Sequence, residues 1–329
     1  TKALLKQAEV FNLVQRADEF GIEVGKVKAN WHKIIGRSRA VADGLANGVS
    51  YLIKKNKVEL VSGQGRITPS KKVEVSNEND ECTETLETSN IIIATGSKPK
   101  TIPGVEIDGN TVLSSKESMV LDVQPKSLLI IGAGAIGIEF AYFYNSFGTE
   151  VTVLEALPQV LPREDAEIAG LLATSLSKQG IRIEVNAVVE SVNLMDGSAE
   201  VAFVGASGKE TKKVEKVLMA VGVSGYTEGL GLEALGVAMN RGDIQVNGRL
   251  QTNVKGVYAI GDVVGPPQLA HMATAEGIAA AEFIAGKERA EIDRTFIPSC
   301  VYCQPQVASV GLTEEQAKAA GHEVKVGRF

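Results

Sequence analysis

One segment constrains what this chain can fold into more than any other. The apolar run Ser127–Ile131 leads into the loop Gly132-Ala133-Gly134-Ala135-Ile136-Gly137, and an apolar run of helical character follows. In G-x-G-x-x-G loops the first glycine makes a tight turn, the second lets a pyrophosphate approach the backbone, and the third lets helix and strand pack closely. Glu155 ends the next expected strand, Val151–Glu155. The segment therefore predicts a parallel βαβ unit that binds a dinucleotide.

The residues of this unit favour one dinucleotide over another. The start of the helix at Ala135 would offer unpaired N–H groups and a positive dipole end to the phosphates. Glu155 would accept hydrogen bonds from the adenosine ribose, and its negative charge would repel a 2′-phosphate. We therefore expect NAD and not NADP. The alternative is a glycine-rich turn without a ligand, which the order of strand, loop, helix, strand and acidic residue disfavours.

The remaining chain alternates between helical and strand-like patterns. Helices are expected over 2–17 and 31–55, the second broken or weakened near Gly44 and Gly48. Short strands are expected over 58–61, 65–67, 72–75 and 91–94. Strands and helices then alternate over 127–185, and an antiparallel meander is expected over 188–219. A further strand over 256–260 precedes a helix over 269–284. Because alternating strands and helices imply parallel sheets, we predict an α/β fold with two nucleotide-binding domains of the Rossmann-like, three-layer type and β-meanders.

Composition excludes several classes of function. The 329 residues contain 34 Lys and Arg against 40 Asp and Glu, a formal net charge of −6, so neither a nucleic acid nor a membrane is expected as a partner. The longest apolar stretch, 127–143, contains three glycines and Glu139 and is not expected to span a membrane. Three cysteines are too few for a secreted disulfide framework, which favours a cytoplasmic location. No cluster of residues has metal-ligand spacing, so no metal site is expected.

A second nucleotide site is suggested by Ala259-Ile260-Gly261-Asp262. Asp262 follows an expected strand, and open α/β sheets bind ligands in the crevice beyond the carboxyl ends of their strands. An aspartate there could hold the hydroxyl groups of a sugar-like chain. Strand-Gly-Asp is also a common turn, and on this segment alone the turn is the more frequent outcome.

Several further motifs occur in an order that resembles one enzyme family. They are Thr1-Lys2-Ala3-Leu4-Leu5, Ala94-Thr95-Gly96-Ser97, the loop 132–139, Gly229-Leu230-Gly231-Leu232-Glu233, the run from Thr252-Asn253 to Gly261-Asp262, Leu269-Ala270-His271 and Val310-Gly311-Leu312-Thr313-Glu314. As a set they resemble the flavoprotein disulfide reductases over essentially the whole chain. Within that family the dihydrolipoamide dehydrogenases are the most similar branch, which implies FAD as a cofactor beside NAD.

The resemblance also implies which residues contact each cofactor. For FAD they are Lys2, Gly65, Thr95, Gly96, Ser97, Asp262, Gln268, Leu269, Ala270 and His271. For NAD they are Gly132, Ala133, Gly134, Ala135, Ile136, Gly137, Glu139, Glu155, Ala187 and Gly222. In the family, the lysine matching Lys2 lies beside the flavin and pairs with the glutamate matching Glu139, and its charge favours the anionic reduced ring. On composition alone the two would be a surface lysine and a carboxylate on a helix face.

The activity implied by the resemblance is oxidation of dihydrolipoamide by NAD⁺ through FAD, in a homodimer served by lipoyl-bearing subunits of 2-oxo acid dehydrogenase or glycine cleavage complexes. Residues 1–120 and 248–294 would form the FAD-binding domain, 121–247 the NAD-binding domain, and 295–329 the start of an α+β dimerisation domain. The family's redox pair C-x-x-x-x-C would precede Thr1, and its glycine-rich FAD loop and His-Glu acid–base pair would also lie outside the 329 residues. The chain is therefore expected to be an internal segment, inactive by itself.

Other interpretations stay open at this point. The protein could be a related flavoprotein reductase of the mercuric reductase or NADH oxidase type, or a catalytically inert dinucleotide-binding fragment. The sequence also departs from the family at one turn, where Val223-Ser224-Gly225 replaces the usual Arg-x-Pro. The contact on the nicotinamide side of that turn is therefore in doubt.

Two further patterns are expected to carry no chemistry. Cys300 and Cys303 form C-x-x-C, but in a strand these positions face opposite sides, so both are interpreted as packing residues. His271 and Glu276 are spaced like the acid–base pair of the family. Because His271 stands in the cofactor-side turn, it is interpreted as an FAD contact and not as a general base.

Overall fold

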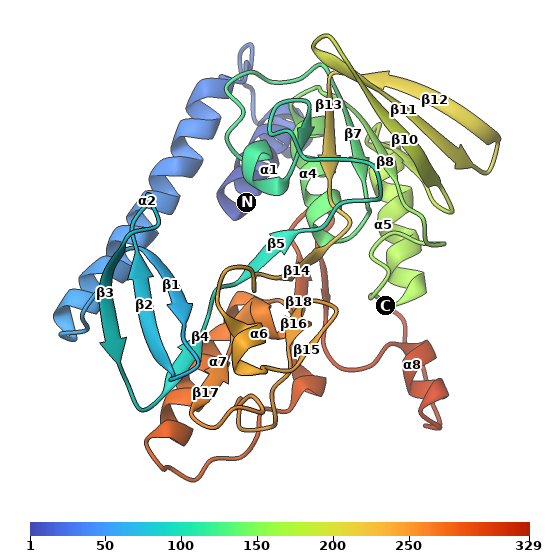
Figure 1. Ribbon diagram of the computed structural model, residues 1–329. Coiled ribbons are helices and arrows are strands. Elements are labelled where there is room, and N and C mark those ends of the chain that lie inside the picture. Colours follow the sequence, from blue (N-terminus) through green and yellow to red (C-terminus); the bar gives the residue numbers. More distant parts are fainter. The chain divides into compact units, whose positions relative to one another are not determined.

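The computed structural model describes all residues from Thr1 to Phe329, which form two compact units. Unit 1 consists of Thr1–Gly48, Pro99–Gly222 and Pro298–Phe329, and unit 2 of Val49–Lys98 and Val223–Ile297. Each unit thus combines segments that are far apart in the sequence, as the colours of Figure 1 show. Residues 1–48 share a unit with the glycine loop, and the expected limits of the cofactor-binding domains stay a prediction.

Unit 1 is organised around a five-stranded sheet in the order β6-β13-β7-β8-β9, of which Figure 1 labels β13, β7 and β8. Its strands are β6 (Val112–Leu113), β13 (Lys216–Met219), β7 (Ser127–Ile131), β8 (Glu150–Leu154) and β9 (Arg182–Glu184). All neighbouring strands are parallel. Leu128, Leu129 and Ile130 of β7 have no exposed surface, as expected of a central strand covered on both faces. The predicted α/β class is therefore confirmed.

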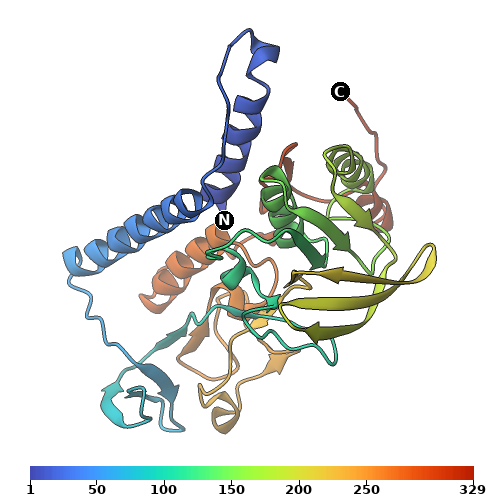
Figure 2. The ribbon, with the colours of Figure 1, turned by 90° about the horizontal axis from the view of Figure 1, so that it is seen from above.

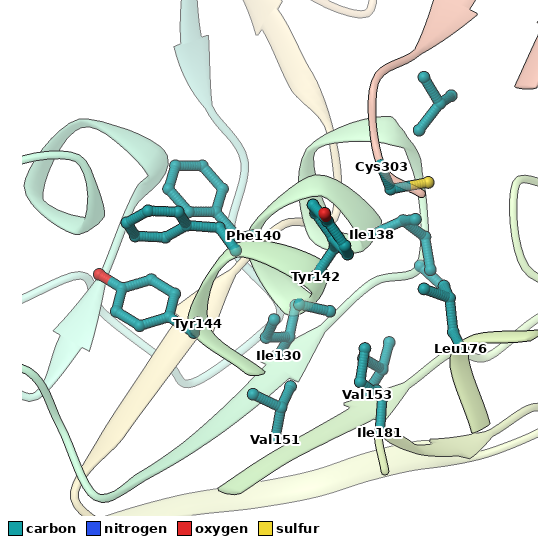
Figure 3. Packing of buried hydrophobic residues seen from close by; sticks show 14 of the residues in the cluster. Ile130, Ile138, Phe140, Tyr142, Tyr144, Val151, Val153, Leu176, Ile181 and Cys303 are labelled. Carbon is teal, nitrogen blue, oxygen red and sulfur yellow. The ribbon is translucent and has the colours of Figure 1, made fainter. Parts of the chain in front are cut away.

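The apolar core of unit 1 includes residues of this sheet and of helices α1 (Lys2–Gln15), α4 (Ala135–Ser146) and α5 (Ala166–Lys178). Four consecutive or nearly consecutive aromatic residues of α4 are at most 1% exposed: Phe140, Tyr142, Phe143 and Tyr144. A helix that is apolar on nearly every side has to be covered by several elements. Figure 3 shows the rings of Phe140, Tyr142 and Tyr144 above Ile130, Val151 and Val153 of the sheet.

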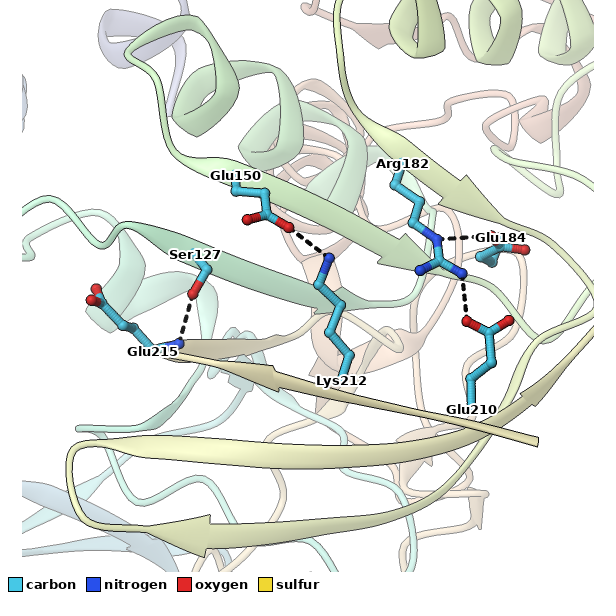
Figure 4. Close-up of polar contacts among 7 residues, drawn as sticks. All are labelled: Ser127, Glu150, Arg182, Glu184, Glu210, Lys212 and Glu215. Carbon is cyan, nitrogen blue, oxygen red and sulfur yellow. Dashed lines mark hydrogen bonds and ion pairs between the residues drawn. The ribbon is translucent and has the colours of Figure 1, made fainter.

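An antiparallel meander belongs to the same unit. Its strands, seen in yellow in Figure 2, are β10 (Val188–Met195), β11 (Ser198–Gly205) and β12 (Gly208–Val214). Val201 and Phe203 are fully buried in a second apolar cluster that includes residues of β7 and β13. Ion pairs at 2.8 Å link Lys212 to Glu150 and Arg182 to Glu210 (Figure 4). Because these groups are partly exposed, each pair adds about 1 kcal/mol at most, and the apolar cluster carries the packing.

Unit 2 combines an antiparallel sheet with a pair of parallel strands. The sheet consists of β1 (Gln64–Ile67), β2 (Lys72–Ser76) and β3 (Cys82–Glu87). The pair consists of β4 (Ile91–Ile93) and β17 (Val257–Ala259). Ile93, Val257 and Val263 lie in the apolar core of this unit. Since β4 and β17 are parallel, the segments that follow them, Thr95–Ser97 and Gly261-Asp262, leave the same edge of the pair.

Apart from helices α2 (Trp31–Lys55) and α7 (Ala270–Ile284), the remaining helices and strands are short and lie outside the sheets described above. Helix α2 contains the boundary between the units. The remaining helices and strands are η1 (Ala17–Phe20), β5 (Ser97–Pro99), α3 (Ser115–Ser118), β14 (Val223–Gly225), α6 (Leu232–Leu235), β15 (Met239–Asn240), β16 (Asp243–Ile244), η2 (Gly261–Val264), α7 (Ala270–Ile284), η3 (Arg294–Phe296), β18 (Ser299–Val301), β19 (Val307–Ser309) and α8 (Glu314–Ala319). No helix combines the length and the apolar character needed to cross a membrane.

Four details differ from the sequence-based prediction. The antiparallel meander expected over 188–219 ends at Val214, because Lys216–Met219 (β13) pairs in parallel with β6 and β7 in the five-stranded sheet. Helix α2 continues through Gly44 and Gly48, because a local cost of about 1 kcal/mol per glycine does not end a helix of 25 residues. Residues 58–61 form no strand, since no strand of the adjoining sheet pairs with them. Strand β3 is missing from the prediction because all but one of its residues are exposed and it shows no apolar alternation.

Candidate functional site

The glycine loop of unit 1 joins the end of β7 to the start of α4. Gly132 has a φ of +104°, and a Cβ atom there would lie 2.4 Å from the carbonyl oxygen of Ala220. A Cβ atom at Gly137 would lie 2.0 Å from the carbonyl oxygen of Gly132. Neither position has space for a side chain, so the first glycine permits the turn beside β13 and the third permits α4 to pack against it.

The middle glycine of the loop has different surroundings. A Cβ atom at Gly134 would meet no atom within 4 Å, and the following residues, Ala135 and Ile136, are exposed. No side chain caps the start of α4. The first turn of a helix carries N–H groups without intrahelical partners and the positive end of the helix dipole. The loop therefore fits the diphosphate of a dinucleotide, which would lie against Gly134.

Glu155 follows β8, and its side chain turns toward the glycine loop. One carboxylate oxygen accepts the N–H of Ala133 at 2.7 Å, and the other accepts the N–H of Leu157 at 2.9 Å. The residue is only 8% exposed. Glu155 thus holds the middle of the loop in place, in addition to the contact with a ribose that the sequence predicts.

The two other expected NAD contacts are Ala187 and Gly222, whose surroundings are described by their backbone atoms. Ala187 is buried, and its N–H donates to the carbonyl oxygen of Glu155 at 2.8 Å. Gly222 is exposed with a φ of +101°, and it lies shortly after β13, whose end meets the loop through Ala220. Glu155 and Ala187 are therefore directly joined by a backbone hydrogen bond, whereas the carbonyl oxygen of Gly222 accepts the N–H of Lys100 at 3.0 Å and not a group of the loop.

A second group of unit 1 brings together α1, α4 and the segment after β18. The Glu139 carboxylate accepts the backbone N–H of Tyr302 at 3.0 Å. The Lys2 ammonium lies 4.8 Å from the centroid of the Tyr302 ring, a cation–π contact. Lys2 and Glu139 form no direct ion pair, and both contact Tyr302 instead. Because Glu139 is partly buried, desolvation raises its pKa, and the Tyr302 N–H and the charges of the Thr1 ammonium and of Lys2 act in the opposite direction.

In unit 2, several expected FAD contacts lie in the segments that follow the carboxyl ends of β4 and β17. The Ser97 hydroxyl donates to the Asp262 carboxylate at 2.8 Å, and Asp262 is half-buried. The Thr95 hydroxyl donates to the carbonyl oxygen of Tyr226 at 2.6 Å, and the Tyr226 N–H donates to the carbonyl oxygen of Gly96. A Cβ atom at Gly96, whose φ is +74°, would meet nothing within 4 Å. A carboxylate oriented by a serine next to an open glycine fits a polyhydroxyl chain such as that of FAD.

The remaining expected FAD contacts of unit 2 are less closely connected. Gln268 donates to the carbonyl oxygen of Asp262 at 3.4 Å. Leu269 precedes the first turn of α7, in which Ala270 and His271 are exposed. Gly65 lies exposed in β1, opposite Val75 of β2. Lys2 belongs to unit 1 and the other expected FAD contacts belong to unit 2.

The three cysteines are unpaired. Cys82 and Cys300 are exposed, and Cys303 is buried beside Ile138 in the core of unit 1 (Figure 3). Burial raises the pKa of the Cys303 thiol to about 12. The interpretation as packing residues therefore holds for Cys303, whereas Cys300 is a surface thiol.

Sequence reasoning did not identify Tyr302 as part of a site. It lies 163 positions from Glu139, and its contribution is a backbone N–H and a ring face. No local sequence pattern predicts these two contacts, because every residue except proline carries a backbone N–H and a single aromatic residue does not indicate which cation lies against its ring. The contact of Glu155 with the Ala133 N–H is hidden for the same reason.

Comparisons with known proteins agree with this geometry. The pyridine nucleotide-disulphide oxidoreductase family model matches residues 1–277, and the model of the family's dimerisation domain matches residues 297–329. The dihydrolipoyl dehydrogenase of Chlorobaculum tepidum is 44% identical over 330 residues, which cover 100% of this chain and 70% of that protein. A dihydrolipoyl dehydrogenase of Bacillus subtilis is 41% identical over 338 residues, covering 100% and 71%.

Solved structures are similar as well. LpdA from Mycobacterium tuberculosis has a TM-score of 0.87 and 26% sequence identity, covering 97% of this chain and 69% of that one. The flavoprotein disulfide reductase RclA from Escherichia coli has a TM-score of 0.83 and 29% identity, covering 97% and 68%. The predicted resemblance, the enzyme class and the cofactors FAD and NAD are thereby confirmed. The chain belongs to the pyridine nucleotide-disulphide oxidoreductase family, and it is an FAD-dependent oxidoreductase related to the dihydrolipoyl dehydrogenases.

Proposed function

We propose that the protein oxidises a dihydrolipoyl group and reduces NAD⁺. The curated relatives that are 41–44% identical over the whole chain support this reaction, because they bear the name dihydrolipoyl dehydrogenase. The chemistry supplied by FAD and NAD⁺ when bound is the transfer of two electrons from a dithiol to a nicotinamide. The contribution of the protein is to bind, orient and stabilise the reacting groups.

The observation that carries this proposal is the anchored glycine loop. Gly134 faces open space while Glu155 holds the Ala133 N–H, so the loop is rigid where a diphosphate would rest. The Glu155 carboxylate keeps free lone pairs after accepting two N–H groups, and these could accept the hydroxyl groups of an adenosine ribose. Its negative charge would exclude a 2′-phosphate, which supports NAD over NADP.

The proposed role of Lys2 is electrostatic. Its ammonium is held against the Tyr302 ring, and Tyr302 is held by Glu139 through its backbone N–H. A cation fixed in this way would favour negative charge on a reduced flavin ring. In unit 2, Asp262 and Ser97 would bind a hydroxyl chain such as that of FAD.

The dithiol–disulfide exchange itself needs a pair of cysteines. The cysteines of this chain do not provide one, since Cys82 and Cys300 are exposed single thiols and Cys303 is buried. We therefore place the redox disulfide outside the 329 residues, as the similarity to dihydrolipoamide dehydrogenases implies. Lipoyl-bearing subunits of 2-oxo acid dehydrogenase or glycine cleavage complexes are the proposed partners, and a cytoplasmic homodimer is the proposed form, which the match to a dimerisation domain supports.

The test compares substrates in the full-length protein. NADH formation from dihydrolipoamide and NAD⁺ is expected, with NADP⁺ a poor substitute. Reduction of mercuric ion or of oxygen by NADH, without activity on dihydrolipoamide, would contradict the proposal and favour one of the related reductases. The 329 residues alone are expected to give no lipoamide turnover, and turnover by them would show that the disulfide is not required.

A further inference from the structure

Glu276 is a buried carboxylate to which neither the sequence pattern nor the proposed reaction gives a role. It lies in α7 and is 1% exposed. One of its oxygens accepts the N–H of Gly261 at 2.7 Å, and the other forms an ion pair with the Arg294 guanidinium at 2.7 Å. Burial raises the pKa of Glu276, whereas the Gly261 N–H and Arg294 favour its charged form.

The hydrogen bond from Gly261 connects Glu276 to the turn that precedes Asp262. Gly261 has a φ of +72°, and a Cβ atom there would lie 3.3 Å from the Ala273 side chain of α7. The turn is therefore seated on α7, with its N–H directed to Glu276. The next residue, Asp262, receives the Ser97 hydroxyl.

Arg294 extends the same arrangement to the far end of the turn. Besides its pair with Glu276, its guanidinium donates to the carbonyl oxygen of Pro266 at 3.3 Å. Gly261 and Pro266 flank Asp262, so one buried carboxylate and one arginine fix both sides of the segment that carries it. Removing one partner of a buried carboxylate destabilises the folded protein, because it leaves a buried charge uncompensated. This arrangement should therefore be sensitive to single substitutions.

We propose that Glu276, held by Arg294, is a positioning residue that fixes the Gly261-Asp262 turn so that the Asp262 carboxylate can bind the hydroxyl chain of FAD. The inference rests on the proposed FAD contact of Asp262. Glu276 does not act as a general base with His271, because His271 is exposed and both oxygens of Glu276 are engaged elsewhere.

The test measures FAD binding and backbone protection in four variants of the full-length protein. Glu276→Ala removes both contacts, and Glu276→Gln keeps an acceptor for Gly261 but turns an amide toward Arg294. Glu282→Gln is the matched control, since Glu282 lies in the same helix and pairs with Arg289 at 2.6 Å without contacting the turn. Asp262→Asn tests the FAD contact itself.

We expect Glu276→Ala to raise the Kd for FAD at least about tenfold, which is about 1.4 kcal/mol, with Glu276→Gln intermediate and Glu282→Gln unchanged. In the FAD-free protein, hydrogen exchange of the peptide 258–264 should become faster in Glu276→Ala and not in Glu282→Gln. Measurements below the unfolding temperature of each variant separate this effect from a general loss of stability.

The possible outcomes distinguish the two proposals. If Asp262→Asn binds FAD as the wild type does, the assignment of Asp262 is wrong and the positioning role falls with it. If Asp262→Asn weakens FAD binding and Glu276→Gln and Glu276→Ala do not, Asp262 is a contact and Glu276 is not its positioning residue. Should Glu276→Ala fail to fold, Glu276→Gln gives the decision by the same two measurements.

Discussion

The Glu155 carboxylate accepts the backbone N–H of Ala133 at 2.7 Å, which joins the end of β8 to the middle of the glycine loop. The same residue that would select NAD by its charge therefore also shapes the loop that would bind the diphosphate. A substitution here acts on both functions, and they can be separated by comparing affinity for NAD⁺ with affinity for NADP⁺.

Glu155→Gln is expected to weaken NAD⁺ binding about tenfold, because the amide can accept only one of the two N–H groups now bound. NADP⁺ should lose less affinity or gain some, because the repulsion of its 2′-phosphate disappears. Titration of the purified protein with each nucleotide measures both. Glu184→Gln is the control, since Glu184 ends the adjacent strand β9 and pairs with Arg182. Equal affinities in wild type and Glu155→Gln for both nucleotides would refute the assignment.

The glycines of the loop should respond differently to alanine. Gly137→Ala is expected to destabilise unit 1 by about 3 kcal/mol or more, because the Cβ atom meets a carbonyl oxygen at 2.0 Å. Gly134→Ala should leave the free energy of unfolding within about 0.5 kcal/mol and still weaken NAD⁺ binding, because its Cβ enters the open space. Denaturant unfolding and nucleotide titration test the two claims. The control Gly170→Ala lies in an uncrowded helix position of α5 and should stabilise slightly.

Glu139 should make the stability of the protein depend on pH in an unusual direction. Its pKa is raised by burial, so the folded state holds the proton more tightly than the unfolded state, and stability falls as the pH rises from the ordinary glutamate pKa through the raised one. Glu139→Gln is therefore expected to raise the unfolding temperature at neutral pH and to match the wild type in acid.

Glu150→Gln provides a control of opposite sign for this pH dependence. The Lys212 ammonium lowers the pKa of Glu150 by a hydrogen bond, so its contribution is present above the ordinary pKa and lost in acid. The variant should be slightly less stable at neutral pH. Thermal unfolding at several pH values measures both variants, and a Glu139→Gln variant that is less stable than wild type at neutral pH would contradict the expectation.

The thiols should react in two classes. Cys82 and Cys300 are exposed and should react with a disulfide reagent in the native protein, while Cys303 is buried with a pKa of about 12 and should react only after unfolding. Titration of the 329-residue chain is therefore expected to give two thiols in native buffer and three in denaturant. A Cys300→Ser variant should lower both counts by one. A wild-type count of one thiol in denaturant that rises to two in Cys300→Ser would instead indicate a disulfide between Cys300 and Cys303.

The amino-acid sequence was sufficient to predict the parallel βαβ unit, because the apolar strand 127–131, the glycines at 132, 134 and 137 and the helix after them form one continuous motif. It also determined the family, since the motifs lie in a fixed order. The tertiary structure alone decided that Glu155 holds Ala133, that Tyr302 contacts both Lys2 and Glu139, and that Glu276 holds Gly261. These contacts join a side chain to a backbone N–H or a ring face of a distant segment, and such partners leave no pattern in the sequence because every residue carries a backbone.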